Sequence, residues 1–502
     1  MNISNLLKKL GLNWGFWLGL LLFFVFIKFP IDAELNPEAQ HLFAIAAIMA
    51  VWWMTEAVPL AVTSLLPLIL YPLLGVMKTS DISPNYMNHL IFLFMGGFFI
   101  AEAIQKWGLH RRFALTTIYW MGKNTNRLIL SFMLVAAFMS MWISNTATAI
   151  MLMPIGIAVI KQLKNNDDSI EPQTRSFETV LMLAIAYGCS IGGTGTLIGT
   201  PPNLVFAGIY RKFFSAQPEI YFSKWIMLIF PLTVLLLFIA FFYLTKLFLK
   251  KENLPEIKNP EFLKKEIESM GRLSPQQKSV LIVFIATALL WIFRRDISLG
   301  NFTIPGWSSL IGLADQIQDS TVAVAMAVLL FIIPGEKGGE KERSRLLALS
   351  DFAKIPWDIL LLFGGGFALA EGIQKTGLAD YLAQSLKFIS HLPLPLLLLI
   401  ICLSITFLTE ITSNTAVATT FLPVLATFTS HTNVPPLVLM LPATIAASCA
   451  FMLPVATPPN AIVFGTRYVS LKNMVSVGFA LNLVSAAAIT LYFLFFNWIF
   501  PF

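Results

Sequence analysis

The sequence predicts an all-α polytopic membrane protein with about 11 transmembrane helices, two re-entrant hairpins and two inverted repeats of five spans each. Of its 502 residues, 57% are hydrophobic and only 12% are charged, and the mean hydropathy is +0.76. A soluble core could not bury so much apolar surface. The long apolar runs, such as residues 226–248, also lack the alternation of a β-barrel strand.

The second observation is an internal repeat. Asn145 and Asn414 each stand in a Ser-Asn-Thr motif, and they are 269 residues apart. The same offset places residues 94–109 on residues 363–378 and Pro154 on Pro423. A shared offset across separate matches indicates that the chain contains two copies of one unit.

The chain begins with an expected N-terminal segment and first span over residues 1–36. The apolar run 14–27 resembles a signal peptide, but no small-residue cleavage site precedes Lys28-Phe29-Pro30, so we interpret it as a retained span. The first repeat is expected over residues 37–250. Its first spans lie near residues 41–57 and 60–76, and the next starts near Asn88.

The stretch 128–160 is too long for one crossing. Its roughly 33 residues would form a straight helix of about 50 Å, whereas the hydrocarbon core is about 30 Å thick. Lys123 precedes the stretch and Lys161 follows it, so both ends are expected on the same side. The simplest solution is a re-entrant hairpin with Ser144-Asn145-Thr146 at its tip.

A broken span is expected over residues 177–210, because Gly192-Gly193 and Thr200-Pro201-Pro202 interrupt it. Proline has no amide hydrogen and disfavours helix at the residue before it. A span near 225–249 and a cytoplasmic linker over residues 251–278 complete this half.

The second repeat, residues 279–502, follows the same plan. A hairpin is expected over residues 392–428, with Ser413-Asn414-Thr415 at its tip, and a broken span over residues 436–467, with Thr457-Pro458-Pro459 at the break. The other spans lie near 279–293, 320–333, 356–374 and 474–499. Because five crossings is an odd number, the second copy is inverted in the membrane and the two hairpin tips face each other.

Four interrupted segments in corresponding halves are typical of a transporter's central binding site. Free amides at a half-helix N-terminus attract carboxylates, and free carbonyls at a C-terminus attract small cations. No Lys or Arg occurs in the four interruptions, so an anion there would be held by helix dipoles and by co-bound cations. A single Ser-Asn-Thr is more often a polar patch or a helix cap, and the paired occurrence favours the functional interpretation.

Other polar residues support different hypotheses. Glu102 and Glu371 could carry protons, but their place beside Gln105-Lys106 and Gln374-Lys375 favours ion pairing, and Glu410 stays a candidate for proton coupling. A channel would need a continuous pore. No enzyme motif appears, so neither catalysis nor a cofactor is expected.

We interpret the net charge of +7 as charge in the loops between spans, with most of the 34 Lys and Arg on the cytoplasmic side. The N-terminus is then expected to be cytoplasmic, and no nucleic-acid partner is expected. The five histidines lack metal-ligand spacing. The three cysteines, which share no short motif, are expected to be packing thiols: Cys189, Cys402 and Cys449.

Residues 448–464 (SCAFMLPVATPPNAIVF), together with both Ser-Asn-Thr motifs, resemble the signature of the divalent anion/sodium symporter family. That family includes sodium-coupled dicarboxylate, citrate and sulfate transporters, and the resemblance extends from about Trp52 to the end of the chain. It implies a homodimer in the lipid bilayer, in which a mobile transport domain with both hairpins and both broken spans slides as an elevator against a fixed scaffold domain.

The resemblance also implies the binding residues. A first sodium site would use Ser140, Ser144, Asn145 and Gly199, and a second would use Thr409, Thr412, Asn414 and Ala456. Substrate carboxylates would meet Ser144, Asn145, Thr146, Thr200, Pro201, Ser413, Asn414, Thr415, Thr457 and Pro458. Thr200 and Thr412 stand where other members carry Ala or Ser.

We therefore expect a sodium-coupled symporter of C4 dicarboxylates such as succinate, malate or fumarate, in a bacterial cytoplasmic (inner) membrane. The alternatives within the family are a sodium-independent dicarboxylate exchanger and a symporter of citrate, 2-oxoglutarate or sulfate.

Overall fold

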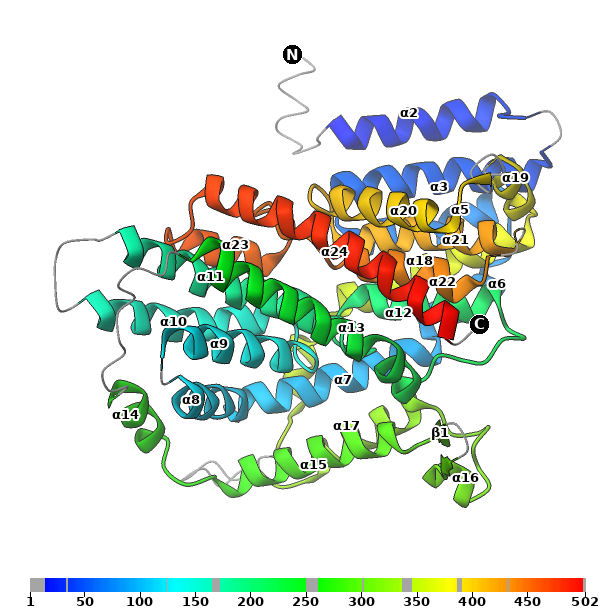
Figure 1. The fold of residues 1–502 in the computed structure, drawn as a ribbon. Coiled ribbons are helices and arrows are strands. Elements are labelled where there is room, and N and C mark those ends of the chain that lie inside the picture. The colour runs from blue at the N-terminus through cyan, green and yellow to red at the C-terminus, as the bar shows by residue number, and fades with distance from the viewer. Residues whose placement is uncertain are drawn as a thin grey trace, which may run out of the picture.

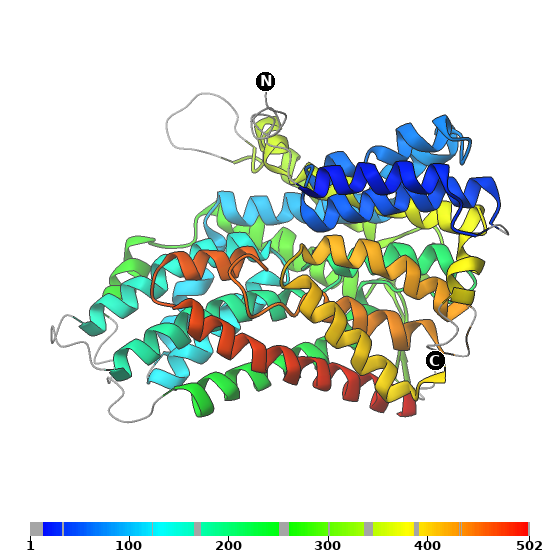
Figure 2. The same cartoon turned by 90° about the horizontal axis from the view of Figure 1, so that it is seen from above.

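The computed structural model describes residues 14–32, 35–122, 124–164, 172–249, 261–299, 302–335, 345–385, 391–430, 432 and 434–499. These residues are mostly helical, and the longer helices lie side by side (Figures 1 and 2). Residues 1–13, where the predicted cytoplasmic N-terminus lies, and residues 251–260 of the predicted linker fall outside this set. Five described helical stretches are long and apolar enough to cross a membrane: Thr79–Lys106, Arg175–Gly193, Phe222–Phe248, Pro275–Ile292 and Leu471–Phe495.

The N-terminal part is a set of helices at one edge of the molecule (Figure 1). The span predicted near residues 60–76 is two short helices, because Pro67 has no amide hydrogen with which to continue the hydrogen-bond ladder of the first helix. The helices of this part are α2 (Trp14–Lys28), α3 (Pro37–Thr55), α4 (Leu60–Thr63), α5 (Leu66–Leu73), α6 (Thr79–Ile82) and the 3-10 helix Ser83–Met87.

Two glycine-containing helices, α7 (His89–Lys106) and α18 (Trp357–Lys375), occupy corresponding places in the two halves of the sequence. Each brings one glycine against the backbone of a neighbour. A Cβ on Gly96 would lie 2.6 Å from the carbonyl carbon of Ala323, and a Cβ on Gly365 would lie 2.6 Å from the carbonyl oxygen of Ser64. A larger side chain at Gly96 would push α7 away from Ala323, and one at Gly365 would push α18 away from Ser64.

A short helix that was not predicted from the sequence follows each of these two helices. α8 (Leu109–Met121) and α19 (Leu378–Ser385) begin after Gly108 and Gly377, whose φ angles of 68° and 77° are left-handed. Glycine adopts this conformation without steric cost, so the chain turns sharply there. Figure 1 shows α8 almost end-on, so it runs across the direction of α7.

Each predicted hairpin region contains two helices joined by a short turn. They are α9 (Thr125–Ser140) with α10 (Asn145–Lys164), and α20 (Leu394–Thr409) with α21 (Asn414–Ser430). Each predicted broken span is likewise two helices separated by an irregular loop. They are α11 (Pro172–Gly193) with α12 (Pro201–Phe213), and α22 (Pro436–Ala446) with α23 (Pro458–Gly465).

The other elements surround this centre. They are α13 (Phe222–Phe242) and its π-helical extension Tyr243–Phe248, α14 (Glu261–Ser269), α15 (Pro275–Ile292), the antiparallel strands β1 (Ile297–Leu299) and β2 (Phe302–Ile304), α16 (Trp307–Leu310), α17 (Asp319–Ile332), the 3-10 helix Leu349–Lys354 and α24 (Leu471–Ile499). The predicted linker thus contains α14, which is joined to α8 by an ion pair between Arg111 and Glu266 at 2.6 Å.

The packing of α9 on α11 gives a first prediction. A Cβ on Gly192 would overlap the backbone of Ala137, which cannot move without shifting α9. Gly192→Ala should therefore lower the free energy of unfolding by about 1–3 kcal/mol. Thermal denaturation of the purified protein in detergent checks this. Gly465→Ala is the matched control, since a Cβ there meets nothing within 4 Å, and equal stability of the two variants would contradict the predicted clash.

Candidate functional site

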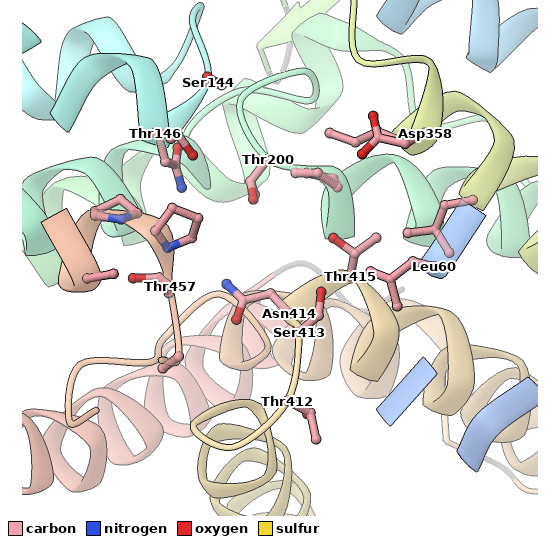
Figure 3. A pocket seen from close by; sticks show the side chains of 18 of the residues that line it. Leu60, Ser144, Thr146, Thr200, Asp358, Thr412, Ser413, Asn414, Thr415 and Thr457 are labelled. Carbon is pink, nitrogen blue, oxygen red and sulfur yellow. The ribbon is translucent and has the colours of Figure 1, made fainter. Parts of the chain in front are cut away.

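The two hairpin turns and the two helix breaks surround one cavity of about 670 Å³. Its other wall comes from the α3–α4 connection, α4, α7 and α18, which contribute Glu56, Leu60, Phe94 and Asp358 among others. The volume is in the range of small-molecule sites. Figure 3 shows the cavity with polar side chains from both halves of the chain around it.

Four helices begin at this cavity. α10 begins at Asn145, α12 at Pro201, α21 at Asn414 and α23 at Pro458, and all four residues line the cavity. The first amides of a helix have no partner within the helix, and together with the helix dipole they present partial positive charge. Proline at the start of α12 and α23 fits this position, because its missing amide hydrogen would be unpaired there anyway. The cavity is therefore suited to an anion.

The side chains at these helix starts add hydroxyl and amide groups. Thr146, Thr200, Asn414 and Thr457 lie around a common space in Figure 3. Thr412 lies on the far side of its turn, and its hydroxyl donates to the carbonyl oxygen of Leu408 at 2.9 Å. This hydroxyl is already used inside the turn.

All ten residues predicted to bind substrate line this one cavity: Ser144, Asn145, Thr146, Thr200, Pro201, Ser413, Asn414, Thr415, Thr457 and Pro458. Of the residues predicted to bind sodium, Ser144, Asn145, Gly199, Thr412, Asn414 and Ala456 also line it. The remaining two, Ser140 and Thr409, are fully buried behind the asparagines.

The two asparagines have matching partners. The Ser140 hydroxyl donates to Oδ1 of Asn145, and the Thr409 hydroxyl donates to Oδ1 of Asn414 at 2.6 Å. These pairs are related by the same 269-residue offset as the motifs. Each Asn side chain is thus oriented by a hydroxyl at the C-terminal end of the preceding helix.

The C-terminal ends of four helices lie at the same hairpin turns and helix breaks. α9 ends at Ser140, α11 at Gly193, α20 at Thr409 and α22 at Ala446. A Cβ on Gly193 would lie 2.8 Å from Oδ1 of Asn145 and 3.2 Å from the carbonyl oxygen of Gly199, so main-chain and side-chain oxygens gather closely there. Carbonyl, hydroxyl and amide oxygens are ligands for a hard cation.

Buried asparagines hold the two break loops. Asn203 Nδ2 donates to the carbonyl oxygens of Gly193 at 3.2 Å and Thr196 at 2.7 Å. Asn460 Nδ2 makes the corresponding bonds to Ala450 and Leu453, both at 3.1 Å. Each break therefore has side-chain donors for carbonyls that no helix can satisfy at membrane depth.

Four cavity-lining residues were not among the predicted site residues: Leu60, Phe94, Trp142 and Asp358. Leu60, Phe94 and Asp358 belong to no repeated polar motif, and their place depends on how α4, α7 and α18 pack. Trp142 is an apolar residue of the α9–α10 turn. Among the described residues the cavity wall contains no Lys or Arg, whereas Glu56 and Asp358 contribute carboxylates.

The glutamates considered as proton carriers have clear partners. Glu371 pairs with Lys212 at 3.0 Å and Lys375 at 2.9 Å, and Glu102 pairs with Lys354 at 2.8 Å. Neither glutamate lines the cavity. Both positions therefore fit the ion-pair interpretation.

Comparison with known proteins identifies related transporters. The chain is 43% identical over 486 residues to the sodium-dependent dicarboxylate transporter SdcS of Staphylococcus saprophyticus, covering 96% of this chain and 91% of that protein. It is 41% identical over 479 residues to SdcS of Staphylococcus aureus strain USA300, covering 95% and 89% of the two chains.

The fold is also similar to the crystal structure of the Alcanivorax borkumensis YdaH transporter, with a TM-score of 0.54 at 10% sequence identity over 84% of this chain and 88% of that one. At this identity the likeness shows the fold alone. The family described as the sodium:sulfate symporter transmembrane region matches residues 11–501. The chain is therefore an integral membrane transporter that belongs to the sodium:sulfate symporter family.

Proposed function

We propose that this protein is a sodium-coupled symporter that imports C4 dicarboxylates such as succinate, malate and fumarate. The observation that carries the proposal is the convergence of four helix N-termini on one cavity that contains no Lys or Arg among the described residues. The SdcS relatives, named as sodium-dependent dicarboxylate transporters, support the same substrate and ion.

The two carboxylates of the substrate would bind at opposite hairpin turns. The amides and side chains of Ser144, Asn145 and Thr146 would donate to one, and those of Ser413, Asn414 and Thr415 to the other. Thr200, Pro201, Thr457 and Pro458 would complete the contact from the breaks. A carboxylate at a helix N-terminus is stabilised by the dipole and by free amides without any cationic side chain.

Sodium would be co-transported at two places. The first would be formed by oxygens of Ser140, Ser144, Asn145 and Gly199, and the second by those of Thr409, Thr412, Asn414 and Ala456. Because each asparagine belongs to a cation site and also lines the substrate cavity, a bound cation orients the group that meets the carboxylate. Through these shared residues, bound sodium would raise the affinity for the dianion, and the bound dianion would raise the affinity for sodium by the same factor. This mutual effect is the basis of coupling.

Transport would proceed by an elevator movement. The corresponding elements of residues 37–250 and 279–502 fit two inverted repeats. The hairpins and broken helices would form the mobile domain, whereas α3–α5, α7, α15, α17, the 3-10 helix Leu349–Lys354 and α18 would form the scaffold. The cavity lies between these two groups of helices, so a sliding movement would carry it across the bilayer.

One ion-pair cluster joins the proposed domains. Lys212, at the end of α12, pairs with Glu371 of α18, and the Gln374 side chain donates to the Lys212 carbonyl oxygen at 3.0 Å. The corresponding residue Glu102 instead pairs with Lys354, inside the proposed scaffold. Only the first contact would have to break when the mobile domain slides.

The protein would act as a homodimer in a bacterial cytoplasmic (inner) membrane. Its N-terminus would lie on the cytoplasmic side. The bacterial source of the SdcS relatives supports the membrane. Exposed apolar side chains on α13, α15 and α24, such as Phe238, Ile282 and Leu491, provide a surface suited to lipid or to a second copy.

The transport proposal predicts that purified protein in liposomes accumulates labelled succinate under an inward sodium gradient and not under an equal potassium gradient. Unlabelled malate and fumarate should compete. Competition by sulfate, citrate or 2-oxoglutarate alone would select the corresponding alternative substrate. Succinate exchange that is equal in sodium and potassium would contradict symport.

Asn145→Ala and Asn414→Ala should each reduce sodium-driven succinate uptake by roughly 10- to 100-fold, because each removes a charge-assisted hydrogen bond and a cation ligand together. Asn473→Ala, in α24 and outside the cavity, is the matched control. Size-exclusion chromatography checks that the variants are folded. Normal uptake by both cavity variants would remove the asparagines from the site.

The elevator proposal predicts that a crosslink between the domains stops transport. Lys212→Cys/Glu371→Cys, joined by a cleavable bifunctional thiol reagent, should lose uptake and regain it when the reagent is cleaved. Glu102→Cys/Lys354→Cys should crosslink without loss of uptake, since both residues lie in the proposed scaffold. The native cysteines are buried and should not react. Full uptake by the completely crosslinked Lys212/Glu371 variant would contradict the movement.

A further inference from the structure

We infer that the buried carboxylate of Glu410 strengthens sodium binding at the second cation site and acts as a positioning residue there. This inference rests on the proposed function. Glu410 lies at the end of α20, directly after Thr409, and it is fully buried. It does not line the substrate cavity, so any effect on transport must pass through its neighbours.

The hydrogen bonds of Glu410 indicate a negative charge. Oε1 accepts from the amides of Phe451 at 2.7 Å and Met452 at 2.8 Å and from Asn482 Nδ2 at 2.7 Å. Oε2 accepts from the amide of Leu453 at 2.8 Å. All four partners donate, and none of them can accept the O–H of a protonated carboxyl, so the arrangement fits the ionised form.

This charge has no ion pair within the described part of the chain, because its bonds there go to three amides and one asparagine. Buried charges in membrane proteins are costly and are normally paired. A sodium ion beside Thr409 and Asn414 would supply the missing positive charge. Glu410 therefore fits a counter-ion that acts at short range through the protein interior.

Two routes connect Glu410 to the second cation site. Along the chain, the preceding Thr409 orients Asn414 through its hydroxyl, at 2.6 Å from Oδ1. Through space, the Leu453 amide donates to Glu410, and the Leu453 carbonyl oxygen accepts from the amide of Ala456 at 3.2 Å. The carboxylate thus holds both the turn and the break loop that would supply cation ligands.

At the first cation site, the position that corresponds to Glu410 carries no charge. The residue that corresponds to Glu410 at the 269-residue offset is Met141. Its carbonyl oxygen accepts from the Thr196 hydroxyl at 2.5 Å, so a neutral bond joins turn and break loop there. The two proposed sites differ by one fixed charge, and the second is expected to hold sodium more tightly.

The test measures the sodium dependence of succinate uptake in liposomes. Glu410→Gln keeps the shape and removes the charge, so the sodium concentration for half-maximal uptake should rise roughly tenfold. The succinate KM at saturating sodium should stay within about threefold of the wild-type value. Glu410→Asp, which keeps the charge, should restore most of the sodium affinity. Glu266→Gln removes a surface carboxylate and is the matched control.

A second variant is used in case Glu410→Gln does not fold. Asn482→Leu removes one donor and leaves the charge, so its sodium requirement should stay within about twofold of wild type. A tenfold rise with Asn482→Leu, or unchanged sodium dependence of folded Glu410→Gln, would overturn the inference. Wild-type uptake that ignores sodium would instead overturn the proposed function, so the two failures are distinct.

Discussion

The structure depends on one constraint, which is that backbone polar groups at the interrupted helices must find partners within the membrane. Each unsatisfied group in hydrocarbon costs several kcal/mol. Asn203 and Asn460 satisfy carbonyls in the two break loops, and Glu410 satisfies three amides in the second. The starts of α10, α12, α21 and α23 line the cavity instead. The same break therefore provides internal stability on one side and a place for a charged ligand on the other.

Symmetry and asymmetry have separate roles here. The Ser140–Asn145 and Thr409–Asn414 hydrogen bonds repeat the same geometry in both halves, so the chain presents two similar ends to a molecule with two similar carboxylates. The contacts that differ lie elsewhere. Lys212 joins α12 to α18, whereas Glu102 keeps its partner within the proposed scaffold. A transporter caught in one orientation is expected to show unequal contacts of this kind at its two faces.

Much of the site could be predicted because the information was local in the sequence. The Ser-Asn-Thr and Thr-Pro-Pro-Asn motifs mark their own helix breaks, and each of them occurs once in each half of the sequence. The helices α8 and α19 were missed because they are short and α8 carries His110, Arg111 and Arg112, so no long apolar run marks them. Asp358 and Leu60 were missed because their place in the wall depends on helix packing. The partners of Glu410 lie 41 to 72 residues away, beyond any sequence pattern.

Main-chain amides at the starts of α10 and α21 stand beside the side chains that line the cavity, and this affects how the energetics of anion binding can be studied. Alanine scanning removes hydroxyl and carboxamide groups but leaves every peptide N–H in place. The sum of such losses will therefore underestimate the total affinity for the anion. Backbone ester substitution, which deletes a single N–H donor at a chosen position, would measure the part of recognition that conventional mutagenesis leaves untouched.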